Sequence, residues 1–120
     1  MLSNVLEAVS NPRNGVIEPE RVAQTLRIPV ARVAALAHVH RNTLKRNPKS
    51  PVVQEGLGEI VRIITDAADL MGGNEGKAVL WFLHQPLSGF NGKTAADLVL
   101  GGHADAVRAH LQMLRDGAYA

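Results

Sequence analysis

The chain has 120 residues, no cysteine and a formal net charge of +2; 46% of its residues are apolar and only 3% are aromatic. This size corresponds to one domain, or to two small subdomains, with a core of aliphatic side chains. The absence of cysteine excludes disulfides, thiolate chemistry and Cys-based zinc sites. No signal-peptide pattern and no apolar run of about 18 residues occurs, so we expect a soluble cytoplasmic protein.

The charge is distributed unevenly. Residues 1–50 contain eight Arg or Lys and three acids, whereas residues 51–120 contain five and eight. Residues 27–49 contain no acid and carry six bases: Arg27, Arg32, Arg41, Lys45, Arg46 and Lys49. Such a basic block favours a polyanion as partner, although a solvated basic face would look the same.

Apolar spacing and helix breakers predict an all-α fold of about seven helices. We expect helices from Pro19 to about Leu26, from Pro29 onward, over about 40–46, over 52–71, over 75–84, over about 95–100 and over about 103–115. The predicted organisation is a helix-turn-helix region at 1–50, a connecting long helix at 51–74 and a C-terminal domain at 75–120.

The stretch "VAALAHVHRNTLKR", residues 33–46, has the pattern of a helix-turn-helix. Ala34 is small enough for two helices to cross, and Val39 and Leu44 are apolar anchors. The turn commonly uses glycine, which adopts positive φ without strain, and this chain has His38 there. The alternative is a helical hairpin that only packs.

The second helix of this pattern would enter the DNA major groove, which is about 12 Å wide. Near its start, Arg41 and Asn42 can pair with guanine and adenine edges. Thr43, Lys45 and Arg46 are predicted to contact phosphate, which positions a protein without reading sequence. The predicted DNA-binding residues are Arg32, Arg41, Asn42, Thr43, Lys45 and Arg46.

Nothing in the sequence indicates an enzyme, a metal site or a cofactor. "GFNGKT", residues 89–94, lacks the first glycine and the preceding strand of a phosphate loop, and Thr94 with Asp97 instead predicts a helix capping box. The five histidines show no metal-binding spacing, and no nucleophile has a recognisable base partner. Trp81 is assigned by default to core packing, although aromatic residues are also enriched in interface anchors.

Residues 78–120, "AVLWFLHQPLSGFNGKTAADLVLGGHADAVRAHLQMLRDGAYA", resemble the C-terminal toxin-binding domain of the Xre/MbcA/ParS antitoxins. The resemblance rests on Trp81 followed by Pro86, Gly92-Lys93-Thr94, Ala96-Asp97-Leu98, the Gly101-Gly102 break, Val107 and Leu111, and the ending 117–120. The preceding "VHRNTL" resembles the helix-turn-helix of the same family.

The resemblance implies an antitoxin of a type II pair whose partner is a RES-domain toxin that depletes NAD⁺. It further implies that the C-terminal segment reaches the toxin's active-site cleft, that operator DNA is bound, and that homodimers or mixed toxin–antitoxin oligomers form. The alternative is a stand-alone helix-turn-helix regulator whose C-terminal half only dimerises. A nucleotide-handling enzyme is disfavoured by the incomplete phosphate loop.

On this interpretation, the Tyr119 ring stacks or hydrogen-bonds in the toxin's cofactor site, and the Ala120 carboxylate is captured by cations. Gly117 lets the chain leave the last helix. The alternative is a tail that folds back onto its own helices. The predicted toxin-binding residues are Trp81, Phe90, Lys93, Arg115, Gly117, Tyr119 and Ala120.

Overall fold

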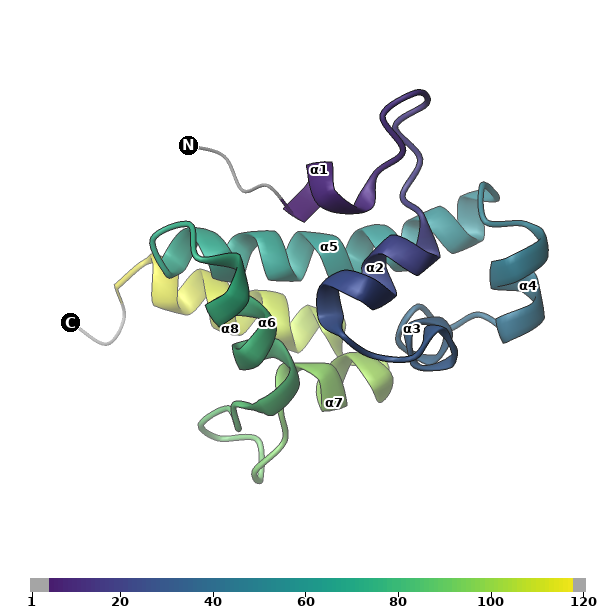
Figure 1. Ribbon diagram of the computed structural model, residues 1–120. Helices are drawn as coiled ribbons and strands as arrows, with labels where there is room; N and C mark the ends of the chain where they lie inside the picture. Colours follow the sequence, from purple (N-terminus) through teal and green to yellow (C-terminus); the bar gives the residue numbers. More distant parts are fainter. Residues whose placement is uncertain (1–4, 118–120) are drawn as a thin grey trace. The chain divides into compact units, whose positions relative to one another are not determined.

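The computed structural model describes residues 5–117, in which the regular secondary structure is entirely α-helical (Figure 1). Its helices are α1 (Val5–Val9), α2 (Pro19–Leu26), α3 (Val30–Leu36), α4 (Arg41–Arg46), α5 (Pro51–Leu70), α6 (Glu75–His84), α7 (Ala95–Leu100) and α8 (Ala104–Arg115). The all-α prediction is confirmed, and the short α1 is an addition to it. None of the described helices is long and apolar enough to cross a membrane.

The described chain divides into two compact units, residues 5–62 and residues 63–117. Helix α5 contributes its first part to the N-terminal unit and its last part to the C-terminal unit.

In the N-terminal unit, α1 packs on α2, α2 on α3 and α3 on α4. Val22, Ala23 and Leu26 of α2 are buried, and Val33 and Ala34 of α3 are buried as well. Helix α5 adds a second stripe at intervals of three and four residues: Val53, Leu57 and Ile60. Burying a side chain of this size stabilises the fold by about 1.5–3 kcal/mol relative to its exposure.

In the C-terminal unit, α7 packs against both α6 and α8. Its aromatic core residue is Phe82, which is fully buried, whereas Trp81 is only half-buried. Val107 and Leu111 of α8 are buried, as their spacing predicts. The default assignment of Trp81 to the core is therefore only partly met, because its neighbour along α6 takes the central position.

Candidate functional site

The turn between α3 and α4 contains a residue in the left-handed region of backbone conformation. His38 has a φ of 59°, the left-handed region for which glycine is the usual residue. The His38 amide donates to the Ala35 carbonyl at 3.1 Å, and the Val39 amide donates to the Ala34 carbonyl at 3.1 Å. These two hydrogen bonds form a Schellman motif at the end of α3, in which His38 occupies the position that is usually glycine.

Helix α4 begins at a histidine cap. The Nδ1 atom of His40 accepts a hydrogen bond from the backbone amide of Asn42 at 3.0 Å, satisfying one of the donors that a helix start leaves unpaired. Leu44 is buried and anchors the inner face of this short helix. The other side chains of α4 therefore form its outer face.

The predicted DNA-binding residues lie largely on that outer surface. Thr43 is half-buried; the exposed members are Arg32, Arg41, Asn42, Lys45 and Arg46. Arg27 and Lys49 are exposed as well, so all six cations of the 27–49 block face solvent. The structure places these charges where a polyanion can reach them.

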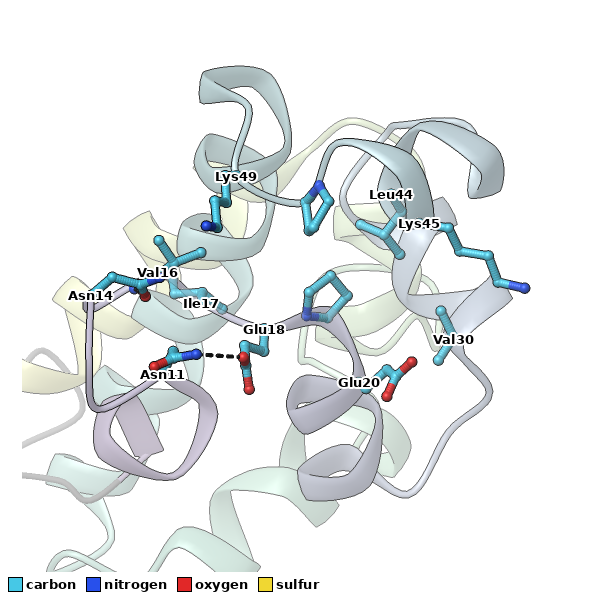
Figure 2. Close-up of a pocket in the computed structure, with 12 residues that line it drawn as sticks. Asn11, Asn14, Val16, Ile17, Glu18, Glu20, Val30, Leu44, Lys45 and Lys49 are labelled. Carbon is cyan, nitrogen blue, oxygen red and sulfur yellow. Dashed lines mark hydrogen bonds between the residues drawn. The ribbon is translucent and has the colours of Figure 1, made fainter.

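A groove of about 360 Å³ lies beside α4 (Figure 2). Residues that precede α2, among them Asn14 and Val16, line it together with Lys49 and with Leu44 and Lys45 of α4. Sequence reasoning missed this groove, because the segment Asn11–Gly15 reads only as a turn and nothing local connects it to α4.

The loop between α6 and α7 is shaped by its own backbone. The Leu87 amide donates to the Lys93 carbonyl at 2.9 Å, and the loop includes a left-handed Asn91 with a φ of 55°. The predicted capping box is confirmed: Thr94 Oγ1 accepts from the Asp97 amide at 3.1 Å, and Asp97 Oδ2 accepts from the Thr94 amide at 3.0 Å. The loop thus follows a helix and opens a helix.

This loop brings two predicted toxin-binding residues together. Phe90 and Lys93 border an open pocket of about 330 Å³, whose wall also includes Leu98 and His103. The Phe90 ring contacts the His110 ring edge to face, with 6.2 Å between ring centroids and 83° between ring planes. Sequence reasoning did not select His103 or His110, because only the fold brings them to the loop.

The other predicted toxin-binding residues lie elsewhere in the C-terminal unit. Arg115 Nη2 is 3.8 Å from Asp66 Oδ1, so this guanidinium is paired with α5. Gly117 has a φ of 71°, as expected for a residue that ends a helix. Tyr119 and Ala120 lie outside the described residues.

Several large apolar side chains of the C-terminal unit are exposed, and the sequence analysis did not single them out. Leu80 is 61% exposed, Leu100 50% and Met113 46%. Helical spacing marks a residue as apolar, but it does not show which apolar residues remain uncovered after packing. Half-buried Trp81 precedes buried Phe82 and follows Leu80, so α6 presents apolar groups outward as well as inward.

Residues 67–117 match the family model described as the antitoxin Xre/MbcA/ParS C-terminal toxin-binding domain. The matched segment starts within α5, contains α6, α7 and α8, and ends at Gly117. It includes Trp81, the Phe90–Lys93 pocket and Arg115, whereas residues 118–120 follow its end. No curated protein and no solved structure matches the chain significantly.

Proposed function

We propose that this chain, whose residues 67–117 match the toxin-binding domain of the Xre/MbcA/ParS antitoxins, is an antitoxin of that family and neutralises a RES-domain toxin that depletes NAD⁺. The observation that carries the proposal is the family match, which spans the helices α6, α7 and α8. Neutralisation of this kind requires binding alone, so the proposal assigns no reaction to the chain.

The proposed mechanism is occlusion of the toxin's active site by the segment that follows α8. Gly117, with its positive φ, redirects the chain at the end of α8 without the strain that a Cβ would bring. A cleft that holds the pyrophosphate of NAD⁺ presents cations and a surface for the adenine or nicotinamide ring. Tyr119 offers an aromatic ring and a hydroxyl for that surface.

The body of the domain would supply the remaining contact area. Phe90 at its pocket and half-buried Trp81 offer aromatic surface, which is enriched in interface anchors. Arg115 would have to exchange its 3.8 Å pairing with Asp66 for a toxin carboxylate, so its contribution is expected to be smaller.

Co-expression with the neighbouring RES-type reading frame tests the mechanism. A chain that stops after Asp116 should still be pulled down with the toxin, because the domain surface remains, but cellular NAD⁺ should fall as it does with toxin alone. Tyr119→Ala should give an intermediate loss of protection. Full protection by the truncated chain would show that the tail does not block the site, and absence of any pull-down by the full chain would remove the RES toxin as partner.

We also propose that the α3–α4 hairpin binds operator DNA and represses the chain's own operon, as a homodimer or within a toxin–antitoxin oligomer. The six exposed cations of residues 27–49, the left-handed His38 turn and the buried Leu44 anchor support this proposal. Arg41→Ala should weaken binding to the upstream duplex at fixed salt, while Arg62→Ala, which removes an exposed charge from α5, should not.

A stand-alone DNA-binding regulator is the second candidate, and the exposed basic block is the observation that favours it. In that case the C-terminal unit serves only for dimerisation. A neighbouring frame without RES character, together with salt-sensitive DNA binding by the chain alone, would select this candidate over the antitoxin with its specific partner.

A further inference from the structure

The segment from Ser10 to Ile17, called the arm below, is an ordered hairpin. Ser10 and Ile17 form an isolated antiparallel bridge, and the Asn11 amide donates to the Val16 carbonyl at 2.8 Å. At the tip, the side-chain carbonyl of Asn11 accepts from the Arg13 amide at 2.8 Å, and that of Asn14 accepts from the Val16 amide at 3.0 Å. These side-chain turns hold the tip in shape.

One side chain from α5 ties the arm to the segment after α4. The Ile17 amide donates to Gln54 Oε1 at 3.0 Å, and Gln54 Nε2 donates to the Ile17 carbonyl at 2.9 Å and to the Pro48 carbonyl at 2.8 Å. All polar atoms of this half-buried amide therefore serve the connection. The base of the arm is consequently held at a set position relative to the end of α4.

The arm and α4 border the same groove from opposite sides (Figure 2). Glu18 and Glu20 also line the groove, and their charge opposes entry of an anion. Two exposed lysines, Lys45 and Lys49, line the groove as well, and exposed Arg13 stands outside it at the tip of the arm. The Arg13 guanidinium has no hydrogen-bond or ion-pair partner among the described residues.

We infer that the arm is a second DNA-contacting element, in which Arg13 binds a backbone phosphate of the same duplex that α4 contacts. The inference rests on the proposed DNA binding by the α3–α4 hairpin and adds a contact outside it. A duplex that contacts Lys45 and Lys49 and also reaches the arm would give the exposed Arg13 guanidinium a phosphate partner. Because a phosphate contact positions the protein without reading bases, the arm should raise affinity for any duplex sequence.

The test compares the purified full-length chain with Arg13→Ala, Arg13→Lys and Arg62→Ala. Arg62 is an exposed arginine of α5 in the same unit, so its removal changes the net charge equally without touching the arm. Binding is measured over a range of salt concentrations with the upstream duplex and with a scrambled duplex of equal length. Circular dichroism checks that each variant keeps its helical content.

A plot of the logarithm of the binding constant against the logarithm of the salt concentration has a negative slope, and loss of one phosphate contact reduces its magnitude by about 0.9. We expect Arg13→Ala to show this reduction and to lower the affinity for both duplexes by the same factor. Arg13→Lys and Arg62→Ala should keep the wild-type slope. Equal slopes for Arg13→Ala and Arg62→Ala would overturn the arm contact and leave the hairpin proposal intact. A loss of affinity confined to the upstream duplex would show that Arg13 contacts a base edge and not a phosphate, and would overturn the assignment. Absence of salt-sensitive binding by the wild type would overturn both proposals.

Discussion

Gly56 of α5 lies directly against Ala37, the residue that ends α3. A Cβ placed on Gly56 would overlap the Ala37 carbonyl oxygen and stand 2.9 Å from the Ala37 Cβ, closer than nonbonded carbon atoms approach. Part of the obstacle is backbone, which cannot swing aside. The residue at 56 must therefore lack a side chain for α5 to approach the helix end that carries the His38 turn.

Gly56→Ala should lower the free energy of unfolding by about 1–3 kcal/mol, as overpacking of a closed contact does. Gly58 provides a matched control, because a Cβ there meets nothing within 4 Å. Gly58→Ala should raise stability by about 0.5–1 kcal/mol, since glycine in a helix interior is unfavourable. Urea titration followed by circular dichroism measures both, and equal effects of the two substitutions would contradict the close approach.

Arg27 ends α2 with a φ of 57°, which a Cβ disfavours. Arg27→Gly should therefore stabilise the chain by up to about 1 kcal/mol, because relief of left-handed strain outweighs the added flexibility of the unfolded chain. Exposed Gln24 within α2 is the control, since Gln24→Gly adds flexibility without relieving strain and should destabilise by about 0.5–1 kcal/mol. Destabilisation by both glycines in the same thermal unfolding series would argue against a strained Arg27.

Glu18 makes the free energy of unfolding of the N-terminal unit depend on pH in the acid range. The hydrogen bond from Asn11, which is 2.9 Å long, and the bond from Arg21 hold the pKa of the Glu18 carboxyl below its ordinary value of 4.5. A depressed pKa contributes stability that is present above pH 4.5 and is lost as the pH falls through the lower, folded-state pKa.

Glu18→Gln should therefore make the decline of unfolding free energy below pH 4.5 shallower, and Asn11→Ala should shift it in the same sense by removing the largest cause of the depressed pKa. Denaturant midpoints measured from neutral pH down through the acid range provide the comparison. Superimposable pH profiles of wild type and both variants would show that the carboxylate is not stabilised in the folded state.

Phe82 and Trp81 are neighbours with different roles. Phe82→Ala should destabilise the C-terminal unit by about 3–5 kcal/mol, because it empties a fully buried site. Trp81→Ala should cost clearly less, since the indole is only half-buried, but it should weaken toxin binding in the pull-down. Circular dichroism is the suitable probe because Trp81 is the single tryptophan. A larger stability loss for Trp81→Ala would reverse the assignment.

Local sequence patterns predicted much of this structure. The spacing of apolar residues and the helix breakers predicted the positions of α2 to α8 to within a few residues. Thr94 and Asp97 predicted a capping box, which the structure contains. Both signals work because helix periodicity and capping involve residues at most a few positions apart. The resemblance to a toxin-binding domain likewise came from spacing along the chain, and the family match at 67–117 agrees with it.

Tertiary structure decided what no local pattern contains. In "EGLGE" the two glycines look equivalent, yet Gly56 is held against Ala37 and Gly58 faces open space. The pairing of Arg115 with Asp66, and the groove that the arm shares with α4, likewise join segments far apart in sequence. Such contacts depend on how the helices pack against one another. That packing is stabilised by contacts throughout the core, so no single stretch of sequence determines it.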